Sequence, residues 1–364
     1  MDVLKGQLRH YLAELITTLR GQSLTTTVVM TLGTFAALSL VYNVLDFVFL
    51  YTRPSQLRRY LHTTNDKPAW ALVTGATSGI GTHLARELAA TGFNVVLHGR
   101  NEAKLRRVQD DLEAAFPARS FRPLLADASA VPCANCVDAA EAVPPAKGKA
   151  AAAGHQHGTL DMDAFVAPLD ALNLTVVINN AGGNAADPMY DVLANVPRRT
   201  VLAVTGLNAV FPLLLQHALL PQLGRDGPAL VVNVGSLSDN GLPLLAAYGS
   251  AKCFLVGLSQ CLAREARLHG GGGTGVDVLA VRLGSVTGTA NRTVPPTLFE
   301  PDAAVMARAI LARVGCGRLE VVPYWRHALQ QAVVTSMPSW IMEGIFREVM
   351  NNLRDEERMG AKEE

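Results

Sequence analysis

The chain has 364 residues, of which 49% are hydrophobic and 17% are charged, and its formal net charge is +1. This size and apolarity exclude disorder throughout and allow one large domain or two ordinary ones. The near-zero net charge supplies no general attraction to nucleic acid, so we expect no nucleic-acid partner. Five cysteines are few and odd in number, which argues against a disulfide framework and favours a reducing compartment.

A long apolar stretch near the N-terminus predicts a transmembrane anchor at residues 24–51. The run from Gly21 to Leu45 holds no charged residue, and about 20 apolar residues span a bilayer core. It lacks the short basic leader and the cleavage pattern of a secretory signal, so we expect the helix to be retained. A buried or interfacial helix is the alternative, because several threonines, Asn43 and Asp46 dilute the hydrophobicity.

Basic residues follow the anchor directly at Arg53, Arg58, Arg59 and Lys67. The positive-inside rule therefore favours a cytosolic location for the large downstream part of the chain. We expect a single-pass membrane protein in which residues 1–23 form an N-terminal segment and residues 52–68 form a linker.

From residue 69 onward, strand-like and helix-like segments alternate, as is typical of a doubly wound α/β fold. The candidate strands are 69–73, 94–98, 121–126, 174–178, 229–234, 276–281 and 319–322. Candidate helices lie at 83–90, 200–223, 247–268 and 302–314. The sequence thus predicts a Rossmann-type, three-layer α/β/α domain with a parallel sheet at residues 69–325.

Residues 128–160 are rich in Ala, Pro and Gly and predict a flexible surface insertion. The insertion holds Cys133, Cys136, His155 and His157, which are residue types that bind zinc. The His-x-His spacing departs from the usual zinc pattern, so we expect no metal site.

The first candidate strand leads into a glycine-rich turn that opens a helix. The turn reads Thr74-Gly75-Ala76-Thr77-Ser78-Gly79-Ile80-Gly81. Glycines let the backbone approach a pyrophosphate, whose charge is favoured by the amides at the helix N-terminus. The order of strand, turn and helix therefore predicts a dinucleotide site.

The second candidate strand ends in Gly99-Arg100, where a dinucleotide fold meets the adenosine ribose. An acidic residue there would bind the 2′-hydroxyl of NAD, whereas Arg100 can pair with a 2′-phosphate. We therefore predict NADPH as the cofactor. A solvated loop arginine is the alternative.

Ser236, Tyr248 and Lys252 are the candidate catalytic residues. Tyr248 and Lys252 are four residues apart in a predicted helix, so their side chains project from one face. An ammonium group beside a phenol stabilises the ionised form, and we expect Lys252 to lower the pKa of Tyr248. Ser236 would hold a substrate carbonyl, and Asn208 would hold a water that links Lys252 to solvent.

Together with Asn179-Asn180-Ala181-Gly182, these motifs resemble those of the short-chain dehydrogenase/reductase superfamily over residues 69–325. The resemblance implies an NAD(P)(H)-dependent oxidoreductase with a catalytic tetrad of Asn208, Ser236, Tyr248 and Lys252. The implied cofactor-binding residues are Thr74, Gly75, Ser78, Gly79, Ile80, Gly81, Arg100, Asp127, Asn179, Ala181, Gly182, Tyr248, Lys252 and Val286. Asp127 matches the adenine-contacting position, and Asn179 matches the asparagine that stabilises the central sheet. Leu283-Gly284 departs from the family's Pro-Gly, which leaves Thr287 and Thr289 without an assigned role.

Two further patches resemble the microsomal 17β-hydroxysteroid dehydrogenase and very-long-chain 3-ketoacyl-CoA reductase branch. They are Arg53-Pro54-Ser55 with Tyr60-Leu61 and Pro68-Ala69-Trp70-Ala71, and His327-Ala328-Leu329 with Met337-Pro338-Ser339-Trp340-Ile341. The resemblance implies an endoplasmic-reticulum enzyme that reduces a long-chain 3-ketoacyl-CoA in fatty acid elongation. A 17β-hydroxysteroid dehydrogenase acting on steroid ketones, a retinoid or sphingoid-base reductase, and a non-catalytic membrane scaffold are alternatives.

Residues 326–364 are expected to form a C-terminal region that serves as a substrate lid or a membrane contact. The stretch 329–346 is apolar but interrupted by polar residues, which favours contact with the membrane interface. The sequence is compatible with a homodimer and with membership of a lipid-elongation complex.

Overall fold

The computed structural model describes residues 10, 23–131, 160–184, 186, 188–225, 227–268, 275–289 and 292–363, without the side chains of residues 360–363. The residues of zinc-binding type, Cys133, Cys136, His155 and His157, lie outside the described residues, as does most of the segment 1–23. The chain divides into two compact units, Met1–Arg53 and Pro54–Glu364.

The first unit contains the helix α2 (Leu24–Thr52), which is 29 residues long and apolar enough by length and composition to cross a membrane. Ser23 begins the helix, and its Oγ accepts a hydrogen bond from the Thr26 amide at 3.2 Å. The hydroxyls of Thr27, Thr31 and Thr52 each donate to a backbone carbonyl four residues earlier. Hydroxyls satisfied inside the helix do not require water, so these threonines are compatible with a lipid environment.

The second unit is built on a seven-stranded sheet in which every neighbouring pair is parallel. Its strands are β1 (Ala69–Val73), β2 (Asn94–Gly99), β3 (Phe121–Leu125), β4 (Asn173–Asn179), β5 (Ala229–Ser236), β6 (Val276–Leu283) and β7 (Glu320–Val321). The strand order β3-β2-β1-β4-β5-β6-β7 reverses between β1 and β4. The residues of β1 and β4 are all buried, because helices cover both faces.

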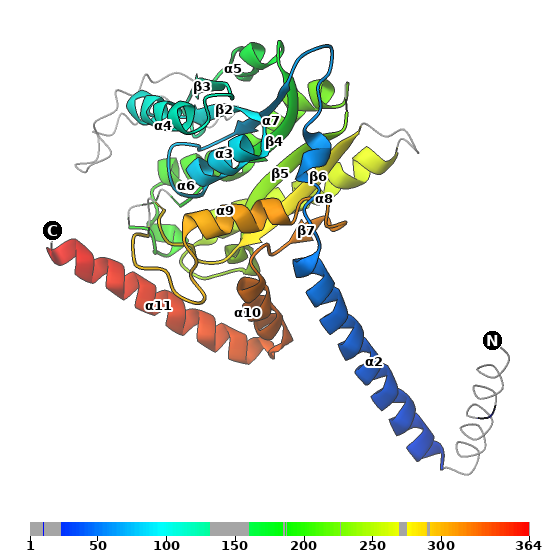
Figure 1. Cartoon of the computed structure of the whole chain (residues 1–364). Coiled ribbons are helices and arrows are strands. Elements are labelled where there is room, and N and C mark those ends of the chain that lie inside the picture. Colours follow the sequence, from blue (N-terminus) through cyan, green and yellow to red (C-terminus); the bar gives the residue numbers. More distant parts are fainter. Residues whose placement is uncertain are drawn as a thin grey trace. The chain divides into compact units, whose positions relative to one another are not determined.

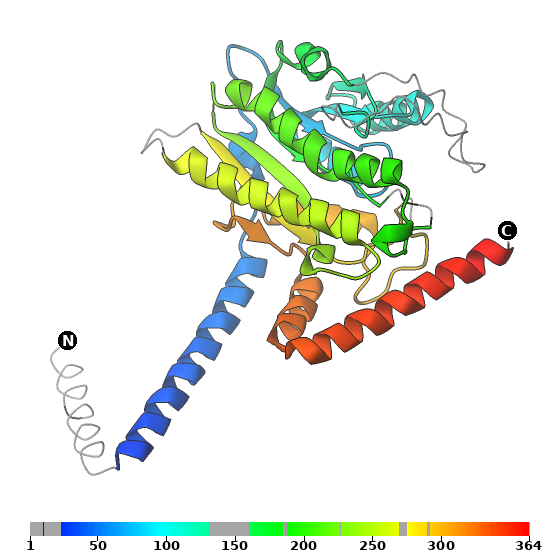
Figure 2. The same cartoon turned by 180° about the vertical axis from the view of Figure 1, so that it is seen from behind.

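The remaining helices are η1 (Leu57–Tyr60), α3 (Gly79–Thr91), α4 (Glu102–Ala115), α5 (Met162–Val166), η2 (Ala167–Leu169), η3 (Leu193–Asn195), α6 (Arg198–Thr205), η4 (Gly206–Val210), α7 (Phe211–Leu223), η5 (Leu237–Asn240), α8 (Ala246–Leu268), α9 (Ala303–Ala312), α10 (Trp325–Ser336) and α11 (Ser339–Glu363). Figure 1 shows α3 and α9 on one face of the sheet, and Figure 2 shows α7 and α8 on the other. The predicted three-layer Rossmann-type fold is therefore confirmed.

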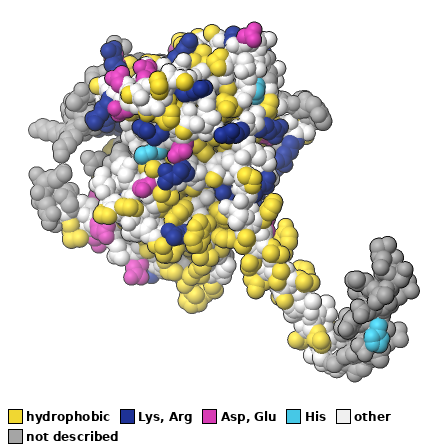
Figure 3. Space-filling view, in the orientation of Figure 1, with side chains coloured by type: hydrophobic (Ala, Val, Ile, Leu, Met, Phe, Trp, Pro, Cys, Tyr) yellow, Lys and Arg dark blue, Asp and Glu magenta, His cyan; other side chains and the backbone are white. Residues whose placement is uncertain are grey.

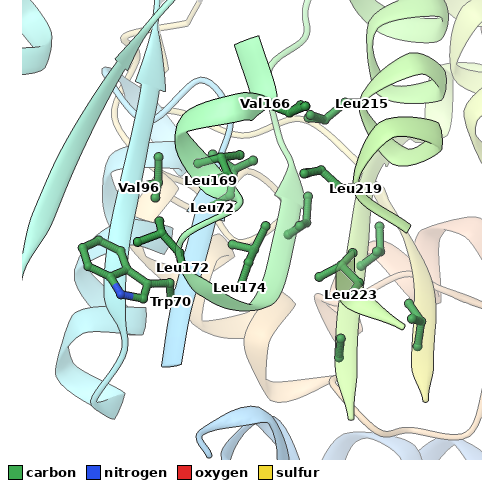
Figure 4. Packing of buried hydrophobic residues seen from close by; sticks show 14 of the residues in the cluster. Trp70, Leu72, Val96, Val166, Leu169, Leu172, Leu174, Leu215, Leu219 and Leu223 are labelled. Atoms are coloured by element: carbon green, nitrogen blue, oxygen red, sulfur yellow. The ribbon is translucent and has the colours of Figure 1, made fainter. Parts of the chain in front are cut away.

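The hydrophobic core lies between the sheet and α7. Leu215, Leu219 and Leu223 follow one face of α7 at a spacing of four residues and are buried against side chains of the strands. Figure 4 shows them close to Leu174 of β4 and Leu72 of β1. Burial of such leucines stabilises the fold by about 2 kcal/mol each, which fixes the sheet that carries the site.

A buried polar network joins the central strands to two helices. The Asn179 Nδ2 of β4 donates to the Asn233 Oδ1 of β5 at 2.7 Å. The Asn233 Nδ2 donates in turn to Gln216 Oε1 at 2.9 Å and to Ser259 Oγ at 2.8 Å. All four residues are buried. The hydrogen bonds between them take the place of bonds to water and so offset the desolvation cost of burying polar groups.

The single helix predicted at 200–223 is wrong in one respect. The chain forms α6, then the π-helical turn η4 that carries Asn208, and then α7. Pro212 has no amide hydrogen for the carbonyl of Asn208, so a regular α-helix cannot continue through this position. The wider π turn accommodates the proline and changes the direction in which Asn208 projects.

The stretch Arg198–Leu223 also passes the length and composition test for a membrane span. Its apolar side chains Phe211, Leu215 and Leu219 are buried in the second unit. It is therefore a core element of the domain.

Large apolar side chains are exposed on α10 and α11. They include Trp325, Leu329 and Val333 on α10, and Trp340, Ile345 and Val349 on α11. We call this set the α10–α11 apolar patch. Hydrophobic side chains gather over the turn between the two helices in Figure 3.

Candidate active site

A cavity of about 430 Å³ lies at the carboxyl ends of the strands, beside the reversal of strand order. This is the position at which doubly wound folds bind ligands. The predicted residues that line it are Gly75, Ser78, Gly79, Ile80, Arg100, Asp127, Ala181, Gly182, Ser236, Tyr248, Lys252 and Val286. The other predicted residues, Thr74, Gly81, Asn179 and Asn208, are buried and are not part of this lining.

The glycine turn after β1 is fastened to the end of β4. The Thr74 Oγ1 accepts hydrogen bonds from the amides of Asn180 and Ala181, both at 2.9 Å. The Asn180 Nδ2 donates to the Thr74 carbonyl oxygen at 2.9 Å. Gly75 has a φ of +67°, and a Cβ there would lie 2.9 Å from the Cα of Ala181, so only glycine is accommodated.

The N-terminus of α3 opens on this turn. Ser78 precedes the helix, and its side chain makes no capping hydrogen bond. The first turn of α3, all of which the structure describes, holds no acidic residue. A Cβ at Gly81 would clash with the Gly75 carbonyl oxygen, so the missing side chain lets the helix pack against the turn. The free amides and the helix dipole suit a pyrophosphate.

Arg100 and Asp127 lie at the ends of β2 and β3 and line the same cavity. Asp127 Oδ1 accepts hydrogen bonds from the amide and the hydroxyl of Ser129, at 2.9 and 2.7 Å. Arg100 is exposed, and within the described part of the chain it has no carboxylate partner. Its charge is therefore available to a bound anion.

His98 lines the cavity and was not predicted from the sequence. Its ring stacks on Phe211 with ring centres 5.5 Å apart and meets the edge of Phe165 at 5.3 Å. Burial lowers its pKa to about 4, partly opposed by the Ala126 backbone and by Asp127. The imidazole is therefore neutral at physiological pH.

Ser236, Tyr248 and Lys252 meet at the other end of the cavity. Ser236 ends β5, and its hydroxyl lies close enough to the Tyr248 phenol to favour the ionised form of the phenol. The Lys252 Nζ lies 5.6 Å from the centre of the Tyr248 ring and donates to the Val234 carbonyl oxygen at 2.8 Å. The first turns of α8 thus place a proton donor and an ammonium group side by side.

The expected lowering of the Tyr248 pKa is not found. Burial raises the pKa of the phenol, Ser236 lowers it, and the negative charges of Asp239 and Tyr190 raise it. Burial also lowers the Lys252 pKa to about 8, against the opposing effect of Asp239. Desolvation by burial is the largest effect on the phenol, so Tyr248 is neutral at physiological pH.

Asn208 is held by the backbone of the neighbouring loop. Its Oδ1 accepts from the Gly183 amide at 3.0 Å, and its Nδ2 donates to the carbonyl oxygens of Gly183 and Val204 at 3.0 and 2.8 Å. A Cβ on Gly182 would lie 2.8 Å from Asn208 Oδ1 and 2.9 Å from Lys252 Nζ. The glycine therefore allows Asn208 and Lys252 to approach the same point.

His327 of α10 packs against the Leu283-Gly284 turn at Gly284. The Gly284 amide donates to His327 Nδ1 at 3.1 Å, and a Cβ at Gly284 would lie 2.9 Å from the imidazole ring. The other ring nitrogen, Nε2, donates to the Phe299 carbonyl oxygen at 2.8 Å. The buried imidazole thus supports the loop that carries Val286 and Thr289 into the cavity.

Several lining residues carry no recognisable signal of a site in the sequence. They include His98, Gly183, Asn184 and Leu207. Gly183 and Leu207 are direct chain neighbours of the predicted residues Gly182 and Asn208, and that adjacency was the available signal.

Comparison with known proteins gives the class of this chain. A family model described as short chain dehydrogenase matches residues 69–148 and 159–297. The chain belongs to the short chain dehydrogenase family and is an NAD(P)-dependent oxidoreductase with a small-molecule substrate.

The curated relatives are more specific. A Coprinopsis cinerea protein named very-long-chain 3-oxoacyl-CoA reductase is 29% identical over 328 residues, covering 87% of this chain and 86% of the relative. The Caenorhabditis elegans very-long-chain 3-oxooacyl-coA reductase let-767 is 28% identical over 281 residues, covering 76% of this chain and 78% of the relative. The resemblance to the very-long-chain reductase branch is thus confirmed.

Solved structures share the fold. One from a study of 7β-hydroxysteroid dehydrogenase stereoselectivity has a TM-score of 0.61 at 20% identity, covering 81% of this chain and 99% of that chain. A short-chain dehydrogenase from Sphingobium yanoikuyae in complex with NADPH has a TM-score of 0.54 at 21% identity, covering 74% of this chain and 96% of that chain.

Proposed function

We propose that this chain is an NADPH-dependent ketoreductase whose substrate is a long-chain 3-oxoacyl-CoA. The observation that carries the substrate class is the match, over 87% of the chain, to a protein named very-long-chain 3-oxoacyl-CoA reductase. The arrangement of Ser236, Tyr248 and Lys252 at the cavity supports ketone reduction as the reaction.

The cavity has the features that a nicotinamide dinucleotide requires. The α3 amides would hold the pyrophosphate, and Asp127 would lie at the adenine end. Arg100 supports NADPH over NADH because a guanidinium binds a 2′-phosphate through charge-assisted hydrogen bonds. Bound at this site, the cofactor supplies a hydride to the substrate carbonyl carbon.

The side chains of this chain would handle the proton. Ser236 donates a hydrogen bond to the substrate carbonyl oxygen and holds the ketone in place. As the carbon–oxygen π bond breaks, its electron pair moves to the oxygen, which takes a proton from Tyr248. The nearby Lys252 ammonium stabilises the phenolate that is left. The Asn208 amide holds the adjoining loop, and a water near it would return the proton from solvent.

We propose that α2 anchors the enzyme as a single span in the endoplasmic reticulum membrane, with the second unit in the cytosol. The length and apolarity of α2 support the span. The α10–α11 apolar patch supports a second contact, in the plane of the membrane interface, because it exposes Trp325 and Trp340. An acyl chain would then reach the site from the lipid without crossing water.

The test is NADPH oxidation by the purified, detergent-solubilised chain with a long-chain 3-oxoacyl-CoA and a 17-ketosteroid in parallel. Tyr248→Phe removes the phenolic proton and keeps the ring, so we expect kcat to fall by about 10² to 10⁴ while NADPH still binds. Turnover of the steroid alone would contradict the acyl-CoA proposal. NADPH binding without turnover of either ketone would favour the scaffold.

A further inference from the structure

The segment Pro188–Val192 is tied to the wall of the cavity. It follows Asn184, which lines the cavity and whose Nδ2 donates to the Met189 carbonyl oxygen at 2.7 Å. Tyr190 is half-buried within this segment, and an ionised Tyr190 would raise the pKa of Tyr248. The segment therefore borders the cavity through its bond to Asn184.

The C-terminal helix holds this segment through one carboxylate. The Glu357 Oε1 accepts a hydrogen bond from the Met189 amide at 2.5 Å, and its Oε2 accepts one from the Tyr190 amide at 3.2 Å. Both oxygens of one side chain thus bind successive backbone amides of a segment about 170 residues earlier in the chain. A carboxylate that accepts from two amides is a stronger restraint than a neutral hydrogen bond.

The sequence of α11 explains how Glu357 reaches this position. Met350, Leu353 and Glu357 are spaced by three and four residues, so they share one face of the helix. Met350 is 2% exposed, which shows that this face is seated against the protein. Figure 1 shows α11 running from α10 as a long, separate helix toward the C-terminus. The seated face delivers Glu357 to the amides.

We propose that α11 is part of the substrate site, with Glu357 as a positioning residue and Tyr190 as a substrate-contacting residue that determines specificity. The assignment rests on the proposed ketoreductase function. In this proposal the distal half of α11 carries the lid role expected of the C-terminal region. A substrate with a long acyl chain would contact Tyr190, whereas a short one would end before it.

The chain offers a matched control in Glu356. Glu356 is exposed and contributes a negative charge near Tyr190, as Glu357 does, but it has no bond to the two amides in the described structure. Glu356→Ala therefore removes a similar charge without releasing the segment. Glu357→Gln keeps a carbonyl oxygen that accepts one hydrogen bond and removes the charge.

The experiment uses the full-length, detergent-solubilised chain and two readouts. Hydrogen exchange measures protection of the Met189 and Tyr190 amides. Steady-state kinetics with NADPH compare a long-chain 3-oxoacyl-CoA with acetoacetyl-CoA. For Glu357→Ala we expect loss of amide protection and a roughly tenfold higher KM for the long substrate, as loss of a charge-assisted contact implies. We expect kcat, the KM for acetoacetyl-CoA and NADPH affinity to change less than about twofold.

Glu356→Ala should show the amide protection and the KM values of the wild type. Glu357→Gln should give values between those of the wild type and of Glu357→Ala. Tyr190→Ala should raise the KM for the long substrate and leave the amides protected. Equal protection in Glu357→Ala and Glu356→Ala would overturn the positioning role. A parallel loss of NADPH affinity and of activity with both substrates would overturn the specificity role, because general destabilisation would explain it. If the wild type reduced neither ketone, the proposed function would fail, while the exchange comparison would still decide whether Glu357 holds the segment.

Discussion

The Lys252 ammonium lies 5.6 Å from the centre of the Tyr248 ring, and both side chains project from the first turns of α8 into the same cavity. Burial affects the two groups in opposite directions, raising the pKa of the phenol and lowering that of the ammonium to about 8. Lys252 is therefore the group of this pair that titrates first as the pH rises.

This order predicts an alkaline limit to ketone reduction. The reduction rate should fall as the pH rises through about 8, because Lys252 loses the charge that stabilises the Tyr248 phenolate. The pH profile of kcat under saturating NADPH and ketone measures it. Lys252→Arg keeps its charge and should move the limit to higher pH. A wild-type profile that stays level to pH values well above 8 would contradict this role of Lys252.

We expect Arg100 to determine the preference for NADPH over NADH. Arg100→Ala should lower the ratio of kcat/KM for NADPH to that for NADH by roughly ten- to a hundredfold, because hydrogen bonds to a charged partner contribute about 1.5 to 3 kcal/mol. Activity with NADH should change little. Arg106→Ala is the control, because Arg106 is ion-paired on the exposed face of α4. An unchanged ratio would mean that Arg100 is a solvated loop residue.

His98 predicts acid sensitivity of the fold. The unfolded chain binds a proton at this residue below about pH 6.5, whereas the native imidazole binds it only near pH 4. Stability is therefore lost as the pH falls between these values, by up to about 3 kcal/mol. Urea unfolding of the wild type and of His98→Gln across this range measures the effect. The variant should show a smaller dependence on pH, and parallel curves would argue against His98 as the cause.

We expect removal of Asn233, the central residue of the buried polar network, to destabilise the fold. Asn233→Leu leaves Asn179 and Gln216 without their partners in the interior. The free energy of unfolding should fall by about 2 to 3 kcal/mol, because unsatisfied buried groups keep their full desolvation cost. Asn352→Leu on the exposed side of α11 serves as the control. Equal urea midpoints for the two variants would show that the network adds no stability.

The sequence by itself determined the elements whose information is local. The order of strand, glycine turn and helix around Gly75 and the four-residue spacing of Tyr248 and Lys252 are contained in short contiguous stretches. They predicted the doubly wound fold, the nicotinamide site and the family. Such motifs can be read because backbone geometry, helix amides and helix periodicity depend on neighbouring residues.

Only the tertiary structure decided the features that join distant segments. Glu357 binds the amides of Met189 and Tyr190, and His327 supports Gly284. No periodicity connects such pairs, because their approach depends on how complete elements pack. The direction of the Tyr248 pKa also follows from tertiary structure, since desolvation is a property of the surrounding fold and the charge four residues away is only one contribution to it.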